Sequence, residues 1–255
     1  MRASHYPIMA TFNPVSNETM SHTLFISDLH LQVDEPHITA TFIDFINNRA
    51  PQAEALYILG DFFETWIGDD DHSEFTQWII EAVRKLADTG TPVYFIRGNR
   101  DLLIGKQFAQ AARVTLLSDP SVIQLYNTPT LLTHGDVLCT LDHRHQHYRR
   151  IVTIPWIQRL FLMLPLSYRR QFANRMRNKS RQRNLNTPTH IMDVSPAAVE
   201  HIMEQHNTPL LIHGHTHRPH IHEVSLGKRI VLGSWHAKGS VLVYREDRSF
   251  ELETL

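Results

Sequence analysis

The stretch Ala55–Asp61, ALYILGD, shapes our interpretation of the whole chain. Five apolar residues run directly into Gly60 and Asp61, which predicts a short buried strand ending in a turn that presents a carboxylate. Four further apolar runs end the same way, in residues that carry charge or bind metals. They are Thr23–Ser27 before DLH, Pro92–Arg97 before GNRD, Thr130–Thr133 before HGD, and Pro209–Ile212 before HGHTH.

Helical patterns separate the first of these strands. Apolar residues recur at helical spacing over Pro36–Asn48 and Glu74–Asp88, and strand–helix–strand order indicates a parallel sheet with helices outside it. The tail differs, because Arg229–Gly233, Ser240–Arg245 and Ser249–Glu253 are predicted as consecutive antiparallel strands with short turns. We therefore expect an α/β fold of two sheets packed face to face and flanked by helices. The polar motifs should gather at the carboxyl ends of strands.

The composition excludes several classes of protein. With 255 residues, 42% hydrophobic and 20% charged, the chain is not disordered throughout. One cysteine, Cys139, excludes a disulfide framework or a thiolate zinc finger and fits a reducing, cytoplasmic setting. The most apolar segment, Ile151–Tyr168, is interrupted by Arg159 and two prolines, so no membrane span is expected. Eighteen histidines provide an unusual supply of metal ligands.

Charge divides the chain into unlike parts. Residues 141–185 contain 11 of the 25 Lys and Arg but one of the 26 Asp and Glu, so their formal charge is +10 against −11 elsewhere. They also hold large apolar residues between 154 and 164. Met20 precedes the first expected strand and is a candidate natural start. We predict three parts: a disordered leader at 1–19, a core at 20–140 and 186–255, and an inserted helical cap at 141–185.

Seven side chains in the five motifs could bind metal ions. Residues two apart on an extended chain point the same way, which pairs Asp28 with His30 and His215 with His217. Carboxylate, imidazole and amide groups suit manganese, iron or zinc. Seven ligands are too many for one tetrahedral ion, whereas two ions sharing Asp61 could clamp an in-line phosphoryl displacement. The candidates are Asp28, His30, Asp61, Asn99, His134, His215 and His217.

The motif order D-x-H, GD, GN, H and GH-x-H resembles the calcineurin-like metallophosphoesterase superfamily over most of residues 23–240. The stretches ISDLHL, YILGDFFETWIGDDD, FIRGNRDLLIGKQFA, THGDVLCTLD and IHGHTHRP, with the RMRN and IMDV block, are similar to the UDP-2,3-diacylglucosamine hydrolase family of the lipid A pathway. The resemblance implies a four-layer metallophosphoesterase sandwich and cleavage of a diphosphate. The implied products are UMP and 2,3-diacylglucosamine 1-phosphate, and the implied cofactor is two Mn²⁺ ions.

The same resemblance assigns roles to individual residues. One ion would be held by Asp28, His30, Asp61 and His217, and the other by Asp61, Asn99, His134 and His215. Asn99 and Arg100 would be catalytic. Substrate contacts fall on Asn99, Arg100, Asp142, Ser180, Asn184 and His215, and on Thr187 where close relatives have lysine. Arg181 and Arg183 are candidate replacements for that missing charge.

Arg100 gives an independent argument about the substrate. Many members of the superfamily have histidine at this position, where it can protonate a departing alkoxide. Arginine cannot act as a general acid near neutral pH, but a phosphate leaving group can depart without a proton. We therefore interpret Arg100 as stabilising charge on the transferring phosphoryl group, which favours a diphosphate as substrate.

The cap combines large aliphatic side chains with many arginines, which suits both a diacyl sugar nucleotide and an anionic membrane surface. We predict a monomer bound peripherally to the cytoplasmic face of the inner membrane, with no nucleic-acid partner because the basic run is interleaved with aliphatics. The alternatives are another dinuclear metallophosphoesterase, such as a nuclease or protein phosphatase, and a non-enzymatic scaffold on the same fold. The scaffold is disfavoured because all seven ligand positions are filled.

Other polar residues near the motifs have less direct interpretations. His213 is expected to orient a ligand, and His236 fits equally a place near the site or simple packing. Asp101 and Asp136 are expected to fix loops by hydrogen bonds. The remaining clusters are interpreted as a polar cap rim at His143, His145 and His147, and as a solvated acidic loop near the site at Asp69, Asp70 and Asp71.

Overall fold

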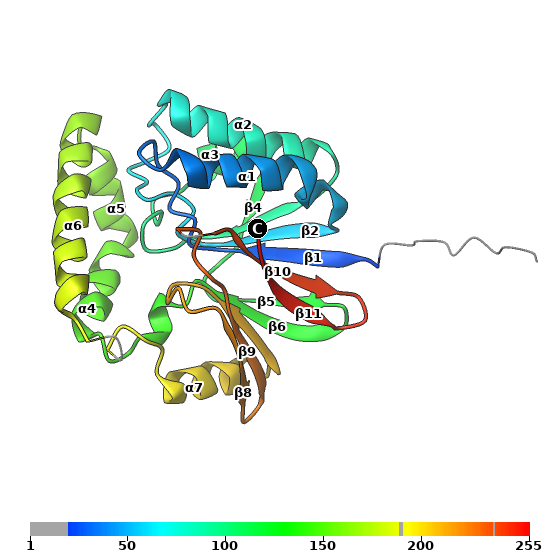
Figure 1. Cartoon of the computed structure of the whole chain (residues 1–255). Helices are drawn as coiled ribbons and strands as arrows, with labels where there is room; N and C mark the ends of the chain where they lie inside the picture. Colours follow the sequence, from blue (N-terminus) through cyan, green and yellow to red (C-terminus); the bar gives the residue numbers. More distant parts are fainter. Residues whose placement is uncertain (1–19, 189–190, 237) are drawn as a thin grey trace, which may run out of the picture.

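The structure, a computed structural model, describes residues 20–255 except 189, 190 and 237, with the backbone alone at 184 and 185. The leader predicted for residues 1–19 lies outside the described residues. Two sheets form the centre of the molecule (Figure 1). The six-stranded sheet has the order β11 (Phe250–Thr254), β10 (Ser240–Arg245), β1 (His22–Ile26), β2 (Ala55–Leu59), β3 (Val93–Ile96) and β4 (Val114–Leu116). The five-stranded sheet has the order β5 (Ser121–Leu125), β6 (Thr128–Thr133), β7 (Leu210–His213), β9 (Gly227–Val231) and β8 (His220–Val224).

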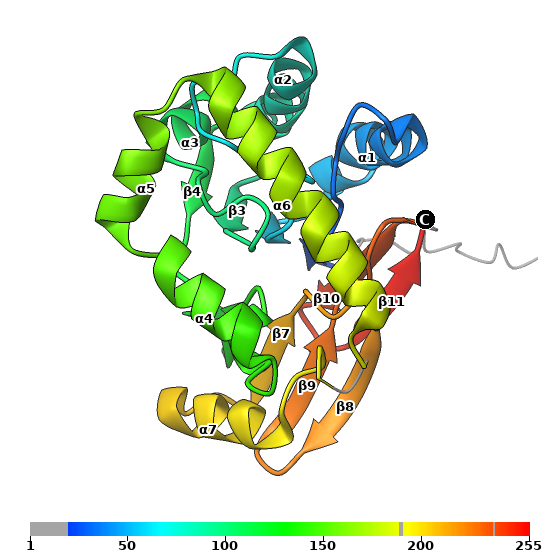
Figure 2. The same cartoon turned by 90° about the vertical axis from the view of Figure 1, so that its left-hand side faces the viewer.

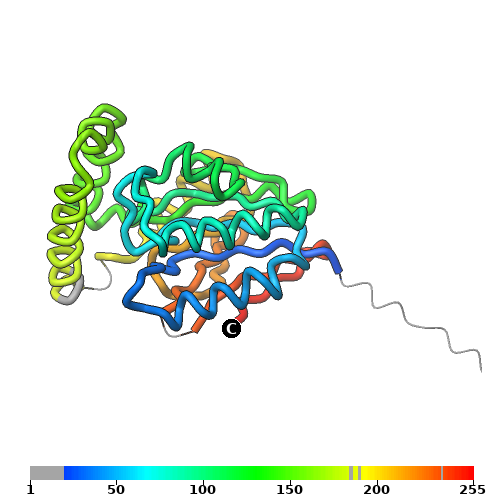
Figure 3. Tube along the Cα trace, turned by 90° about the horizontal axis from the view of Figure 1, so that it is seen from above, coloured from blue at the N-terminus to red at the C-terminus, as the bar shows by residue number. Residues whose placement is uncertain are grey.

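Helices cover the outer faces of both sheets and so complete four layers. The six-stranded sheet is covered by α1 (Pro36–Asn48), α2 (Glu74–Asp88) and α3 (Lys106–Ala112), and the five-stranded sheet by α7 (Pro196–His206) (Figure 1). Short 3₁₀ turns occupy η1 (Ala50–Gln52) and η2 (Asp136–Leu138). Three more helices stand at one end of the sheets (Figure 3): α4 (His143–Val152), α5 (Pro155–Leu162) and α6 (Leu166–Asn186).

The sheets pack because their strands are apolar on both faces. Alternate residues of β1 face opposite ways: Leu24 and Ile26 join the core beneath the helices, whereas Phe25 joins the core between the sheets. Neighbouring residues of β6 divide in the same manner, with Leu131 against α7 and Leu132 between the sheets. Each of these five side chains is fully buried, which fixes the register of the strands that carry the polar motifs.

The predicted fold class is confirmed, and every polar motif follows the carboxyl end of a strand. β1, β2 and β3 are parallel neighbours, as are β6 and β7. One prediction for the tail is wrong, because β9 and β10 lie in different sheets rather than pairing with each other. The chain crosses between the sheets after β9, and Trp235 in this crossing is buried against Phe42 and Phe45 of α1. That burial explains the crossing, whereas the β10–β11 hairpin forms as predicted.

The segment predicted as a helical cap contains α4, α5 and all but the last residue of α6. Figure 2 shows α6 passing in front of the two sheets. No helix within the described residues is long and apolar enough to cross a bilayer.

Candidate metal centre

The turns that follow the strands have an unusual backbone. Five of the seven predicted ligands have left-handed conformations: Asp28, His30, Asp61, His215 and His217, with φ between 50° and 69°. This conformation costs about 1 kcal/mol or more for each residue with a Cβ atom. Backbone hydrogen bonds between two of the turns fix the conformation of Asp28 and His30. The N–H of Asp28 donates to the carbonyl oxygen of Gly60, and that of His30 donates to the carbonyl oxygen of Asp61, each at 3.0 Å. Backbone geometry of this cost is typical of functional sites.

The glycines of the motifs allow the acidic ligands to lie against the backbone. A Cβ atom added at Gly98 would lie 2.2 Å from Asp61 Oδ1, and one added at Gly214 would lie 2.3 Å from Asp28 Oδ2. The Asp28 carboxylate uses this space to accept the backbone N–H of His215 at 2.8 Å. The GN and GH motifs are therefore required sterically as well as chemically.

The first group of side chains lies between β1 and the turn after β7. The Nε2 atoms of His30 and His217 are 3.4 Å apart. Asp28 Oδ1 lies 3.2 Å from His217 Nε2, and Asp61 Oδ2 lies 3.8 Å from His30 Nε2. These are the four residues predicted to hold one ion.

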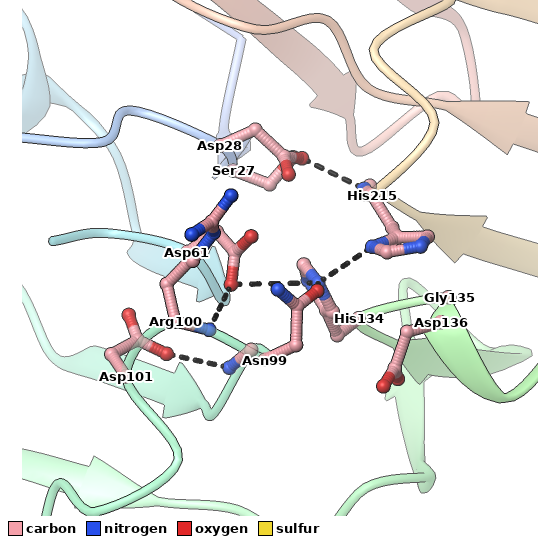
Figure 4. Close-up of polar contacts among 12 residues, drawn as sticks. Ser27, Asp28, Asp61, Asn99, Arg100, Asp101, His134, Gly135, Asp136 and His215 are labelled. Carbon is pink, nitrogen blue, oxygen red and sulfur yellow. Dashed lines mark hydrogen bonds and ion pairs between the residues drawn. The ribbon is translucent and has the colours of Figure 1, made fainter. Parts of the chain in front are cut away.

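The second group faces the other oxygen of Asp61 (Figure 4). His134 Nε2 lies 3.6 Å from Asp61 Oδ1, 3.1 Å from Asn99 Oδ1 and 3.2 Å from His215 Nδ1. Asp61 thus directs one oxygen to each group, which is the geometry that a bridging ligand requires. The structure brings all seven predicted ligands together.

The donor set fits two cations. Within each group, ring nitrogens and carboxylate oxygens point at one another, and the few protons on these atoms cannot join all of them by hydrogen bonds. Such convergence is expected of ligands that share an ion. Asp28 Oδ1 is buried, and its 3.2 Å contact with His217 Nε2 is not a hydrogen bond, so this oxygen has no hydrogen-bond donor among the described residues. Although burial lowers the pKa of His134, the carboxylates of Asp61 and Asp28 outweigh it and raise the value to about 10. A site that attracts a proton this strongly favours positive charge in general.

Surrounding groups fix the orientation of the ligands. His134 Nδ1 lies 2.9 Å from the carbonyl oxygen of Leu59, which leaves Nε2 to face the other ligands. Asp101 accepts the backbone N–H groups of Gly98 and Phe62 at 2.6 and 2.7 Å, so it fixes both loops as predicted. Burial and the carboxylate of Asp61 raise the pKa of Asp101 to about 6.

His213 lies behind the second group of ligands. Its Nδ1 is 2.9 Å from the carbonyl oxygen of Gly214, the residue before His215. Burial lowers the pKa of His213 to about 3, so the ring is neutral at physiological pH. This placement agrees with an orienting role.

A cleft of about 600 Å³ opens between the core and the cap beside these ligands. Its apolar lining comes from Trp66, Ile67, Leu102, Leu103, Ile151, Val152, Ile157, Phe161, Phe172 and Met176. Its cations are Arg100, Arg144, Arg177, Lys179 and Arg183. Asn99 belongs both to the metal-binding group and to this lining, so the cleft begins at the candidate metal centre.

The predicted substrate contacts have unequal positions. Arg100 and Ser180 line the cleft, whereas Asp142 caps α4 by accepting the N–H of His145 at 2.9 Å and pairs with Arg183. The Thr187 hydroxyl donates to the backbone carbonyl of Arg183 at 2.9 Å. Of the two candidate replacements, Arg183 lines the cleft and Arg181 is exposed. The side chain of Asn184 lies outside the described residues.

The interpretation of the acidic run as a solvated loop holds only for Asp70, whose side chain is half exposed, and all three carboxylates make tertiary contacts. Asp69 accepts backbone N–H groups at the start of α3, including that of Gly105 at 2.9 Å. Asp70 pairs with Arg169, and Asp71 pairs with Arg170 at 2.7 Å. The run therefore fastens the cap to the core. Its cause is tertiary: the arginines lie about a hundred positions away in the sequence and are brought to the loop by folding.

Three further side chains approach the ligands. The ring of His236 stacks on His30 with centroids 5.3 Å apart, which favours a place near the site over simple packing. His145 lies 3.3 Å from Asp136 and its ring centroid is 5.6 Å from that of His215. Sequence reasoning missed Glu64, which lies 2.9 Å from His30 Nδ1. The available signal was its position three residues after Asp61.

Comparisons with known proteins found a matching family model and similar sequences. The family model described as calcineurin-like phosphoesterase matches residues 21–219. A protein of Coxiella burnetii named UDP-2,3-diacylglucosamine hydrolase is 57% identical over 238 residues, covering 92% of this chain and 98% of that protein. One of Aeromonas hydrophila with the same name is 49% identical over 227 residues, covering 88% and 94%.

Proposed function

The chain belongs to the calcineurin-like phosphoesterase family, and on that premise we propose that it hydrolyses the diphosphate bond of UDP-2,3-diacylglucosamine to UMP and 2,3-diacylglucosamine 1-phosphate. The observation that carries the proposal is the placement of Asp61. Its two oxygens face two ligand groups at the mouth of a cleft whose walls are largely apolar. Metal-assisted phosphoryl transfer and capture of a lipid are thus combined in one site.

The chain's own residues have defined tasks in this reaction. Two divalent ions, when bound, would lower the pKa of a water nucleophile and neutralise phosphate charge. Asp61 would set the spacing of the two positions. The backbone N–H of Arg100 donates to Asp61 Oδ1 at 2.8 Å, which brings its guanidinium to the cleft wall beside the ligands. There it would stabilise the charge that develops on the phosphoryl group.

We propose manganese as the resident metal. The candidate ligands mix carboxylate and amide oxygens with imidazole nitrogens, a set that Mn²⁺ accepts. Asp28 and Asp61 contribute the charge, and the ligands are Asp28, His30, Asp61, Asn99, His134, His215 and His217.

The cleft accounts for the acyl chains. Its volume of about 600 Å³ lies in the range of ligand sites in proteins. Phe161 and Phe172 lie in its wall, where their rings are 5.5 Å apart, and both come from the cap. Acyl chains would bury this apolar surface, while Lys179 and Arg183 on α6 would attract the phosphates.

We also propose that the protein acts as a monomer at the cytoplasmic face of the inner membrane. One chain supplies every candidate ligand, which supports the monomer. The exposed apolar side chains of the cap, which we call the outer cap, support the membrane location. They are Trp156, Met163 and Tyr168, which are 64%, 80% and 66% exposed. Arg159 is exposed one turn after Trp156, and a basic group beside anionic lipid adds about 1 kcal/mol to binding.

A product-resolved assay tests the proposed reaction. The protein would be stripped with a chelator and assayed on UDP-2,3-diacylglucosamine before and after addition of Mn²⁺. Manganese-dependent formation of UMP and the lipid 1-phosphate is expected. Failure on this lipid, with bis-nitrophenyl phosphate still cleaved, would contradict the substrate and favour a nuclease or phosphatase.

A further inference from the structure

Glu64 is held beside the candidate metal centre by its backbone. Its N–H donates to the carbonyl oxygen of Leu31 at 3.2 Å, and the preceding Phe63 forms a β-bridge with the same residue. Leu31 follows His30 directly, so the loop after β2 is fastened to the loop after β1. The side chain of Glu64 is 16% exposed and lies in the cleft wall.

One carboxylate oxygen of Glu64 faces a predicted metal ligand. Oε2 lies 2.9 Å from Nδ1 of His30, whose own side chain is 5% exposed. The other ring nitrogen of His30 faces His217 at 3.4 Å and Asp61 at 3.8 Å. The 2.9 Å contact is an ion-pair distance and not a hydrogen bond, but a carboxylate this close to Nδ1 favours a proton on that nitrogen. Nε2 would then be free to coordinate a metal, and the imidazole would be a stronger ligand.

The second oxygen of Glu64 faces the cleft. Oε1 lies 4.0 Å from Nη1 of Arg100, whose side chain is 23% exposed. Arg177 of α6 also lines the cleft and donates to Gln32 Oε1 at 3.1 Å, so the cap adds a cation on this side. Glu64 therefore lies between a metal ligand and the arginines that face the substrate.

We propose that Glu64 is a positioning residue that orients His30 toward the metal pair and holds the Arg100 guanidinium at the mouth of the cleft. The alternative is a structural ion pair that contributes to folding alone. The two oxygens distinguish these roles, because a folding contact would not need to join a metal ligand to an arginine in the cleft. The Arg100 part of the inference rests on the proposed function, whereas the His30 part rests on metal binding alone.

The test is a Mn²⁺ titration of the whole protein, followed through the electron paramagnetic resonance signal of free Mn²⁺. Glu64→Gln keeps the size and an acceptor oxygen but removes the charge. It is expected to weaken binding of one of the two ions by roughly 10- to 100-fold, as loss of a carboxylate behind a histidine ligand does. Glu81→Gln is the matched control, because Glu81 is an exposed carboxylate paired with Arg84 on α2.

A double-mutant cycle identifies the path of the effect. If Glu64 acts through His30, adding Glu64→Gln to His30→Ala should produce no further loss of Mn²⁺ affinity. Unchanged affinity in Glu64→Gln, equal weakening of both ions, or full additivity with His30→Ala would each overturn the inference. Thermal unfolding checks the fold. Glu64→Asp, which keeps the charge but withdraws it by one methylene, is expected to weaken the same ion should Glu64→Gln not fold.

The titration uses no substrate, so it separates this inference from the proposed function. A protein inactive on UDP-2,3-diacylglucosamine would still give a readable Mn²⁺ affinity. If that activity is found, Glu64→Gln should also raise KM for the diphosphate through Arg100, and an unchanged KM would remove the Arg100 part of the inference.

Discussion

The metal-binding turns and the cap are held in place by different forces. The metal-binding turns directly follow strands whose side chains, such as Phe25 and Leu59, are fully buried between the sheets. In the cap, α4 and α5 contain no buried residue. Its contacts with the core are largely ionic: Arg149 contacts Asp119 and Asp136, Arg169 contacts Asp70, and Arg170 contacts Asp71.

The difference implies a division of labour. Apolar burial is insensitive to salt and to moderate changes in pH, whereas an exposed ion pair such as Arg170 with Asp71 is screened by salt and contributes little. The buried Arg169 is the exception among the contacts of the cap. The core can thus keep its ligands at fixed positions while the cap adjusts to a large, flexible lipid. Phosphoryl chemistry and lipid capture should then be separable by mutation.

The largest effect is expected from Asp61→Asn. The substitution removes the charge shared by the two ligand groups, and loss of several kcal/mol of transition-state stabilisation predicts a decrease in kcat of roughly 10³-fold or more. Both the lipid diphosphate and bis-nitrophenyl phosphate should be affected, as initial rates would reveal. Asp44→Asn on the exposed face of α1 is the control. Retained activity on either substrate would remove the bridging role of Asp61.

A smaller and more selective effect is expected from Arg169→Met. The Arg169 side chain is 2% exposed and donates to the backbone carbonyls of Ile67 and Leu164 at 2.6 and 2.8 Å. Leaving these groups without a donor costs about 1–3 kcal/mol, so we expect KM for the lipid to rise about tenfold. Hydrolysis of bis-nitrophenyl phosphate should not change.

Arg170→Met is the matched control for this variant. Arg170 makes the neighbouring ion pair to Asp71, but its side chain is 54% exposed, and such pairs contribute 0–1 kcal/mol. Equal effects of the two substitutions would show that burial of Arg169 does not hold the cap.

Membrane binding should depend on the outer cap and not on exposed tryptophan in general. Trp156→Ser is expected to weaken binding to phosphatidylglycerol vesicles about fivefold, corresponding to about 1 kcal/mol of lost apolar burial. Trp78→Ser is the comparison, because Trp78 is 51% exposed on α2, in the helical layer of the core. Vesicle sedimentation measures both. Similar losses for the two variants would argue against a cap-specific membrane surface.

The weakest expected response of the cap is to pH. The contact with Arg169 lowers the pKa of Asp70, and although burial raises that of Asp142, the contact with Arg183 outweighs it and lowers the value below 3.8. Asp70 of the core and Asp142 at the start of α4 both pair with α6. A carboxyl pKa that is lower in the folded than in the unfolded protein stabilises the position of α6 at pH values above the unfolded pKa, and this stabilisation is lost as pH falls through the folded pKa. Hydrogen exchange of α6, corrected for intrinsic rates, should therefore be constant from pH 8 to about 5 and rise below about 4. A change between pH 7 and 5 would implicate other groups.

Much of the core could be predicted from local sequence. The helices Pro36–Asn48 and Glu74–Asp88 and the strand Ala55–Leu59 have the predicted bounds, because their apolar periodicity matches the surfaces they bury. The seven candidate ligands could be proposed from sequence because each lies in a turn that follows a buried strand, and parallel strands bring their carboxyl ends to one edge. Neither argument needs contacts between distant residues.

What the sequence left undetermined depends on such contacts. The antiparallel pairing predicted for β9 and β10 failed because Trp235 enters the core beneath α1 instead of continuing a hairpin. The partners of Asp70 and Asp71 come from α6, about a hundred positions away. The short strand β4 and helix α3 lack a strong periodic signal and gain their stability from packing.

The left-handed turns narrow the choice of residue at the metal centre. Away from glycine, aspartate, asparagine and histidine are the types that adopt this backbone most readily. All five candidate ligands with a left-handed backbone are aspartate or histidine. At each position the same residue therefore both tolerates the backbone conformation and offers an atom that can bind a metal. Glutamate binds the same ions but lacks this backbone preference. A redesign for another metal at Asp28 or Asp61 is therefore restricted to the short ligands, and a longer carboxylate would require rebuilding the turn itself.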